Sequence, residues 1–339
     1  MINLKKIVFL ILMTMILAGL TGPAAYSKND EAPQLDRGKV LISIPYGKNY
    51  GEISGPSTGA GMAAIDNPSC FTVDSAENIL ITDAVAGKIL KVSRDEKKAT
   101  EIFNYKKSVI GSDYVSNIAV SNSGFIYLAD AEANRCVKFS QDGRELAVLG
   151  EEGRGKSFSK IQNIFTDDSS AVLVIDSLAH RISIFDDNGK FTGEVKLPIS
   201  KMIFSYETAA DISGNLYISS LKDNTFKIMR ADKTSEVIFS HTCDPRDLGA
   251  KIVNCHLIGF DEKENAYLNA AVIGDGKTSI SHYLVKFEKG RKEYRKIKIP
   301  APPKEASRVM ARPYMLLREN VIVSYASDAK EFKIVKFEF

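Results

Sequence analysis

The chain has 339 residues, of which 44% are hydrophobic, and its 45 basic and 42 acidic residues give a formal net charge of +3. This near-neutral balance offers no basic field for nucleic acid, so no nucleic-acid partner is predicted. A chain of this length could hold two domains, but the internal repeats described below predict one.

The first 27 residues have the pattern of an export signal. Lys5 and Lys6 precede a long apolar run, and Ala25–Ser27 supplies small residues for cleavage. The alternative is an uncleaved membrane anchor, because Ile7–Tyr26 carries no charge over 20 residues. Both interpretations place the rest of the chain outside the cytoplasm. A membrane is an expected partner only if Met1–Ser27 is retained.

A polar segment, residues 28–38, follows and is predicted to be flexible. Lys39–Ile44 is the first predicted strand, and it lies ahead of the first complete repeat. Its pattern resembles that of the fourth strand in later repeats, such as Glu145–Leu149. The strand is therefore expected to belong to a sheet formed elsewhere in the chain.

One repeat is especially clear between Ile118 and Gly150. It contains four short runs rich in β-branched and aromatic residues, which are Ile118–Val120, Ile126–Ala129, Cys136–Phe139 and Glu145–Leu149. Tight turn signals separate the runs, which indicates four antiparallel strands in a meander. A sheet this small leaves a face uncovered, so it must stack against copies of itself.

Copies of the second run recur at spacings of 47, 46, 44, 50 and 55 residues, and they are Ile79–Asp83, Ile126–Asp130, Val172–Asp176, Leu216–Ser220, Ala266–Ala270 and Val321–Tyr325. A period of about 40 to 50 residues with four strands per unit is typical of a β-propeller blade. The prediction is an all-β chain with a single six-bladed propeller over residues 39–339. The last repeat ends one strand short, at Phe332–Phe337, so Lys39–Ile44 is expected to complete the last blade and close the ring.

Four segments resemble the NHL-repeat pattern, namely Asn67–Asp74, Ile79–Asp83, Asn134–Phe139 and Asp176–Phe185. The resemblance covers the first three repeats, roughly Asn67–Val195, whereas the later repeats lack the Asp and the Asn/His-Arg pair. It implies an NHL-like six-bladed propeller. It implies no single activity, because such propellers include binding modules and a few lyases and hydrolases.

The four cysteines permit disulfides in an exported chain. Cys243 and Cys255 lie in or beside one insert and form the favoured pair. Cys136 takes the position that isoleucine occupies in two other repeats, so it is interpreted as a buried apolar side chain. A bridge between Cys70 and Cys136 stays open as an alternative.

The starts of the inner strands should lie at one level, at the mouth of the central channel, and they carry Cys70, Asn117, Asn163, Glu207, Leu257 and Arg312. The polar members, Asn117, Asn163, Glu207 and Arg312, are the candidate ligand-binding residues. The alternative is a hydrated channel lining. A calcium site needs six or more oxygen ligands, whereas this ring has one carboxylate and a guanidinium that opposes a cation. An anionic or neutral polar ligand is therefore favoured.

Other chemistry-bearing residues favour structural roles. Asp83, Asp130 and Asp176 recur in register, as expected for carboxylates that accept backbone N–H groups in the following loop. The stretch Gly150–Ser157 fits a phosphate-loop pattern but lacks the helix that this loop requires. The four histidines show no zinc-ligand spacing. No metal site or cofactor is predicted, while calcium and zinc stay open.

The sequence therefore favours an exported binding or scaffold module for a protein or a small polar ligand, with no catalytic residues predicted. The competing hypothesis is a secreted propeller lyase or hydrolase that uses the central channel.

Overall fold

The computed structural model divides the chain into two compact units, Met1–Pro33 and Gln34–Phe339. The residues that it describes all belong to the second unit: 39–49, 51–54, 68–93, 98–110, 115–150, 157–197, 206–210, 216–222, 225–231, 237–243, 250–261, 263–274, 280–289, 294–299, 315–318, 321–327 and 331–339. The predicted signal Met1–Ser27, the segment 28–38 and Arg312 lie outside them.

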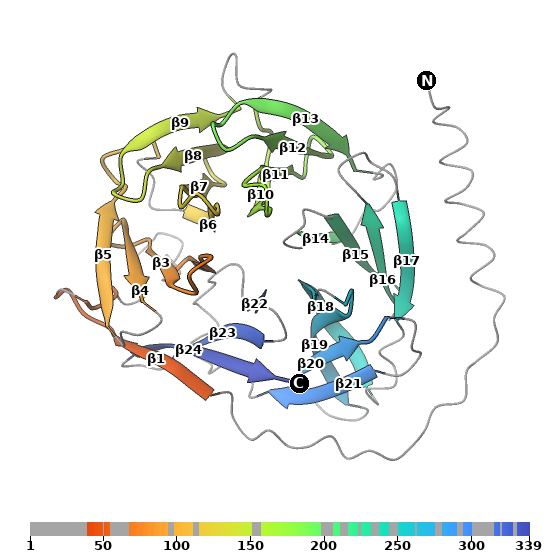
Figure 1. Cartoon of the computed structure of the whole chain (residues 1–339). Helices are drawn as coiled ribbons and strands as arrows, with labels where there is room; N and C mark the ends of the chain where they lie inside the picture. Colours follow the sequence, from red (N-terminus) through yellow and green to blue (C-terminus); the bar gives the residue numbers. More distant parts are fainter. Residues whose placement is uncertain are drawn as a thin grey trace, which may run out of the picture. The chain divides into compact units, whose positions relative to one another are not determined.

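The described residues form six four-stranded antiparallel sheets and no helix (Figure 1). Sheet 1 contains β2 (Cys70–Val73), β3 (Ile79–Asp83), β4 (Lys88–Val92) and β5 (Ala99–Asn104). Sheet 2 contains β6 (Val115–Val120), β7 (Ile126–Asp130), β8 (Arg135–Phe139) and β9 (Glu145–Leu149). Sheet 3 contains β10 (Ile161–Thr166), β11 (Val172–Asp176), β12 (Arg181–Phe185) and β13 (Phe191–Lys196). Sheet 4 contains β14 (Tyr206–Ala210), β15 (Leu216–Lys222), β16 (Thr225–Ala231) and β17 (Val237–Cys243). Sheet 5 contains β18 (Ala250–Phe260), β19 (Ala266–Gly274), β20 (Ile280–Phe287) and β21 (Tyr294–Ile299).

Sheet 6 combines strands from the two ends of the described chain. It contains β22 (Met315–Arg318), β23 (Val321–Ser327), β24 (Glu331–Glu338) and β1 (Lys39–Pro45), in that order across the sheet. β1 pairs antiparallel with β24, and Ile42 and Ile44 lie opposite Ile334 and Phe332. Both β1 isoleucines are buried, whereas Ser43 and Pro45, which alternate with them, are exposed. The strand therefore buries one face and leaves the other in solvent, as expected for the edge of a sheet.

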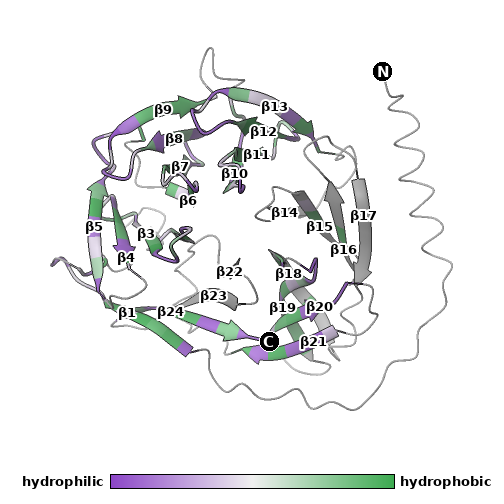
Figure 2. Cartoon of the chain, viewed as in Figure 1, coloured by the Kyte–Doolittle hydropathy of each residue, from purple (hydrophilic) through white to green (hydrophobic). Residues whose placement is uncertain are grey.

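The second strand of a sheet is the most apolar because both of its faces are covered. Every residue of β3, β7 and β11 is buried, which explains their uninterrupted apolar runs. The fourth strands β5 and β13 mix buried and exposed residues instead. Figure 2 shows the corresponding pattern, with hydrophobic residues along the strands and hydrophilic residues in many of the connecting loops.

Apolar clusters fill the boundaries between neighbouring sheets. Each of the six clusters among the described residues draws side chains from two sheets. Phe103 of sheet 1, for example, stacks on Phe139 of sheet 2 with ring centroids 5.2 Å apart. The cluster that contains Ile44 and Phe332 of sheet 6 also contains Phe71 of sheet 1. The core is thus divided into separate layers between sheets, and each sheet depends on its neighbours for burial.

The turn between the first and second strands has one design in three sheets. In sheet 1, Asp74 Oδ1 accepts hydrogen bonds from the amides of Ala76 and Asn78, at 2.9 and 2.8 Å. Asp167 and Asp261 accept equivalent bonds from residues four positions ahead, at 2.8 and 2.9 Å. Each of these carboxylates satisfies loop amides that no strand partner reaches.

Candidate ligand pocket

The recurring aspartates at the ends of β3, β7 and β11 are fully buried and organise the loops around them. Asp83 Oδ1 accepts the amide of Ala86 at 2.9 Å, and Asp130 Oδ1 accepts two amides at 2.9 Å each. Asp176 Oδ1 accepts the amide of Ala179 at 3.2 Å. The predicted loop-supporting role of these three carboxylates is confirmed.

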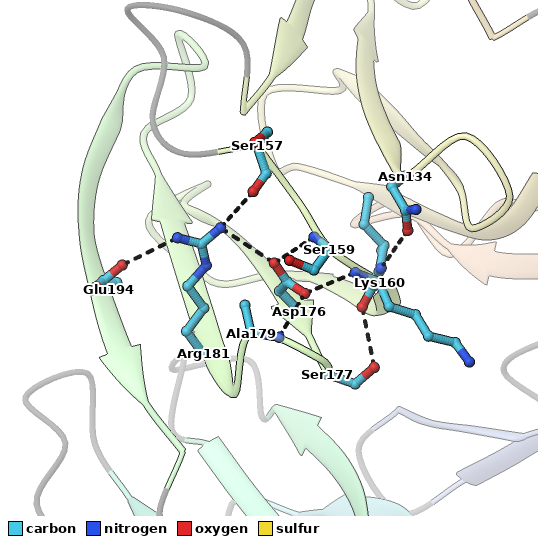
Figure 3. Close-up of polar contacts among 10 residues, drawn as sticks. Asn134, Ser157, Ser159, Lys160, Asp176, Ser177, Ala179, Arg181 and Glu194 are labelled. Carbon is cyan, nitrogen blue, oxygen red and sulfur yellow. Dashed lines mark hydrogen bonds and ion pairs between the residues drawn. The ribbon is translucent and has the colours of Figure 1, made fainter.

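The carboxylate of Asp176 reaches beyond its own loop (Figure 3). Its Oδ2 accepts the amide of Ser159 and its Oδ1 accepts the amide of Lys160, both at 2.9 Å. The Lys160 carbonyl in turn accepts the amide of Ser177 at 2.9 Å and its hydroxyl at 3.2 Å. The backbone of Lys160 is therefore fixed at both its N–H and its C=O.

A buried arginine completes this cluster. Arg181 Nη2 lies 3.3 Å from Asp176 Oδ2 and donates to the Ser157 carbonyl at 2.7 Å. Arg181 Nη1 lies 3.6 Å from Glu194 Oε2. Arg181 is only 8% exposed, so its charge depends on these partners for compensation. The cluster therefore fixes the backbone of residues 157–160, which lead into β10.

The inner strands of sheets 2 and 3 are irregular at matching places. The register of β6 against β7 shifts between Val115 and Asn117, and that of β10 against β11 shifts between Ile161 and Asn163. Each shift adds one residue that has no partner of its own in the pairing, Ser116 in β6 and Gln162 in β10. Such β-bulges bend the strand and redirect side chains.

The bulges are followed by a contact between two predicted site residues. Asn117 Nδ2 donates a hydrogen bond to Asn163 Oδ1, which also accepts the amide of Ile164 at 2.9 Å. Asn117 and Asn163 come from different sheets, so the repeat register brings them together as predicted at the sequence level. Asn117 is only 2% exposed. At least one side-chain donor of Asn117 is thus used within the protein.

A cavity of about 600 Å3 opens beside this contact, between sheets 2 and 3. It is lined by the two bulge residues and by residues at or next to the ends of β7, β10 and β11: Ser116, Ala131, Glu132, Lys160, Ile161, Gln162 and Ser177. Glu132 carries a negative charge on the sheet 2 side, and Lys160 carries a positive charge on the sheet 3 side. We refer to this cavity as the bulge pocket. Its volume lies in the range of sites for small molecules.

The other predicted channel residues are only partly described. Glu207 lies on β14, where the structure describes the backbone but not the side chain, and Arg312 lies outside the described residues. Cys70 and Leu257 are buried. Of the four candidate ligand-binding residues, the structure therefore places Asn117 and Asn163 together, and a ligand-binding role of all four stays a prediction.

The described cysteines form no disulfide. Burial raises the pKa of Cys70 to about 12 and also raises the pKa of Cys136. Cys255 is also buried and forms no disulfide, on the inner strand of sheet 5. Cys243 ends β17, at the opposite edge of the neighbouring sheet 4, and its side chain is not described. The structure thus shows neither a Cys70–Cys136 disulfide nor a disulfide at Cys255.

A second polar cluster lies around the turn between β12 and β13. Tyr127 Oη donates to Asp187 Oδ1 at 3.2 Å, and Lys138 Nζ donates to the Asp187 carbonyl. The Lys138 ammonium also lies 3.5 Å from the centroid of the Phe125 ring. Burial, followed by the nearby Asp187 charge, raises the pKa of Tyr127. Burial lowers the pKa of Lys138, and the Asp187 charge opposes that shift.

Within the described ranges, no group of three or more histidine, cysteine, aspartate or glutamate side chains is arranged to hold a metal ion. The same part of the chain contains no helix long and apolar enough to cross a membrane.

No protein-family model matches this chain, and no curated protein matches it. Solved structures do. Virginiamycin B lyase from Staphylococcus aureus aligns with a TM-score of 0.51 at 15% identity, over 83% of this chain and 98% of the lyase. The WD40 repeats of RRP9 align with a TM-score of 0.50 at 11% identity, over 91% of this chain and 99% of that one.

The fold is a β-propeller. This conclusion combines the four-stranded antiparallel sheets with the likeness to WD40 repeats, which form propeller blades. A DUF4221 family member from Bacteroides vulgatus also aligns, with a TM-score of 0.52 at 12% identity, over 88% of this chain and 97% of that one. At such identities the likeness concerns the propeller fold alone.

Proposed function

We propose that this propeller is a binding module that holds a small polar ligand in the bulge pocket. The observation that carries the proposal is the pair of matched β-bulges, because they direct Ser116 and Gln162 to one cavity from two sheets. Bulges are frequent next to binding and active sites, where they redirect side chains. The Asn117–Asn163 contact beside the cavity supports a fixed wall.

The propeller in this proposal has six blades and is closed by the N-terminal strand. Six described sheets support the number, and the pairing of β1 with β24 supports the closure. The apolar cluster shared by sheets 6 and 1 also favours a ring, because it covers the faces that an open array would expose. The NHL-like pattern of the first three repeats is retained as part of the proposal.

Export through Met1–Ser27 is also proposed. Its test is to sequence the N-terminus of protein recovered outside the cytoplasm. A chain that begins after residue 27 supports cleavage, whereas an intact Met1 favours the membrane anchor and a membrane partner.

The binding proposal is tested by a thermal-shift screen of small polar molecules on the full chain. Two variants locate the hits: Gln162→Ala alters the bulge pocket, and Arg312→Ala alters the predicted channel mouth with Glu207. The matched control is Gln141→Ala, because Gln141 is an exposed glutamine in the turn between β8 and β9.

The expected result is a hit that Gln162→Ala abolishes and Gln141→Ala preserves. A hit that depends on Arg312 alone would move the site to the channel mouth. If no hit depends on either residue, the small-ligand function is wrong and a protein partner becomes the better explanation. Chemical conversion of a hit compound would favour the lyase or hydrolase alternative.

A further inference from the structure

The bulge pocket has opposite charges on its two walls. Glu132 follows β7 in sheet 2, and Lys160 precedes β10 in sheet 3. Both side chains are exposed, and no ion pair within the described part of the chain joins them or engages either one. Each wall therefore presents one charge to whatever enters the cavity.

The backbone under each charge is fixed. The Glu132 amide donates to Asp130 Oδ1 at 2.9 Å. The Lys160 amide and carbonyl are both bonded, to Asp176 and Ser177 respectively. In Figure 3 the Lys160 side chain extends away from this cluster and ends without a drawn contact. The two charged side chains thus start from rigid positions, which limits the entropy lost when a ligand orders them.

Two arginines of sheets 2 and 3 are already engaged elsewhere. Arg181 is paired with Asp176 and Glu194, at 3.3 and 3.6 Å. Arg135 Nη1 donates to the Val109 carbonyl at 2.8 Å. Of the charged residues that line the cavity, Lys160 is the cation and Glu132 the anion.

The space between the two charges is neutral. Ser116, Gln162 and Ser177 bring hydroxyl and amide groups, and Ala131 and Ile161 bring apolar surface. The two hydroxyls donate to backbone carbonyls, so they face a ligand as acceptors. A simple anion or cation would satisfy one wall and leave the other charge facing a ligand that cannot pair with it. A dipolar molecule satisfies both, with its uncharged middle over the neutral groups.

We propose that the bulge pocket selects a small zwitterion, an amino acid or a short peptide with free ends, with its carboxylate at Lys160 and its ammonium at Glu132. This inference rests on the proposed function, because it names the ligand class of the same pocket. The cavity volume of about 600 Å3 accommodates molecules of this size.

The test uses the free amino acids and a set of unblocked dipeptides, each compared with its N-acetylated and its C-amidated form. Affinities for the full chain are measured by isothermal titration calorimetry. We expect at least one unblocked member to bind and each blocking group to weaken it about tenfold, the effect of losing one charge-assisted contact.

Two variants assign the ends of the ligand. Glu132→Gln should weaken the unblocked ligand about tenfold and leave the N-acetylated form unchanged, because the lost contact is the same in both cases. Lys160→Gln should do the same for the amidated form. Glu101→Gln and Lys190→Gln are matched controls, since both residues are exposed and lie outside the pocket lining, and neither should alter binding.

Two results would overturn zwitterion selection alone, and a third would overturn both proposals. One is that no unblocked member binds more tightly than its blocked forms. Another is that blocking and substitution weaken binding independently of each other. If either occurs while other polar hits still depend on Gln162, the pocket function survives and only zwitterion selection is wrong. If no compound of either screen depends on Gln162, both proposals are wrong.

Discussion

Replacing Asp176 by asparagine should destabilise the fold far more than the same change at Asp130. Both carboxylates are buried at equivalent positions, at the ends of β11 and β7. They differ in what their second oxygen contacts. Asp176 Oδ2 accepts the Ser159 amide at 2.9 Å and pairs with Arg181 at 3.3 Å. Asp130 Oδ2 has no hydrogen-bond partner in the described part of the chain.

The expected magnitude follows from these contacts. In Asp176→Asn the remaining oxygen can keep the amides of Lys160 and Ala179, but the new NH2 group faces two other donors. One charge-assisted bond of about 1.5–3 kcal/mol is lost. Arg181, only 8% exposed, also loses its nearer partner, and breaking a buried ion pair costs about 3–5 kcal/mol. The two losses overlap, so we expect about 3–5 kcal/mol in total.

In Asp130→Asn the oxygen that accepts the amides of Glu132 and Ala133 can be retained. The NH2 group then replaces an oxygen without a described partner, so the expected cost is about 1 kcal/mol, for weaker acceptance by a neutral amide. Urea unfolding of the parent and both variants, followed by circular dichroism, gives the free energies. Equal costs, or a larger cost at Asp130, would refute the assignment of Asp176 and Arg181 as a stabilising pair.

Three further predictions concern the rest of the propeller. Deleting β1 (Lys39–Pro45) removes two buried isoleucines and should lower the unfolding free energy by about 3–6 kcal/mol; a truncated chain that melts like the parent would contradict the proposed closure. Cys70, Cys136 and Cys255 are buried and form no disulfide, so a thiol reagent at pH 8 should label them only after unfolding, and rapid labelling of the native chain would show that these sites open. The pKa of Tyr127 is raised in the folded chain, so its phenol stabilises the fold at pH values below the ordinary pKa of 10.0. This contribution is lost as the pH rises above 10.0, because the unfolded chain then releases the phenol proton first. The stability cost of Tyr127→Phe should therefore shrink between pH 8 and pH 11, and a constant difference in urea unfolding would refute the linkage.

Much of the propeller could be predicted from the spacing of one strand. The second strands were predicted as Ile79–Asp83, Ile126–Asp130 and Val172–Asp176, which are the bounds of β3, β7 and β11. These strands are covered on both faces, so burial forces an apolar run that is easy to recognise. The same register correctly brought Asn117 and Asn163 together.

The walls of the bulge pocket were missed for a physical reason. Ser116 and Gln162 are extra residues in their strands, and one inserted residue changes the side-chain alternation without leaving a recognisable pattern. Lys160 was missed because its position depends on a side-chain contact: its amide donates to the Asp176 carboxylate at the end of the neighbouring strand β11. An arrangement of this kind depends on geometry between elements, whereas sequence periodicity reports only the order within an element.

The matched bulges also have an evolutionary consequence. A bulge absorbs one additional residue while the pairing on both sides of it continues, so a single inserted codon can change one repeat without disrupting its blade. β2 and β14 pair with their neighbours without such a shift, whereas β18 has two shifts at other places. A repeat protein of this kind can therefore acquire a binding surface in two copies while other copies keep the original scaffold.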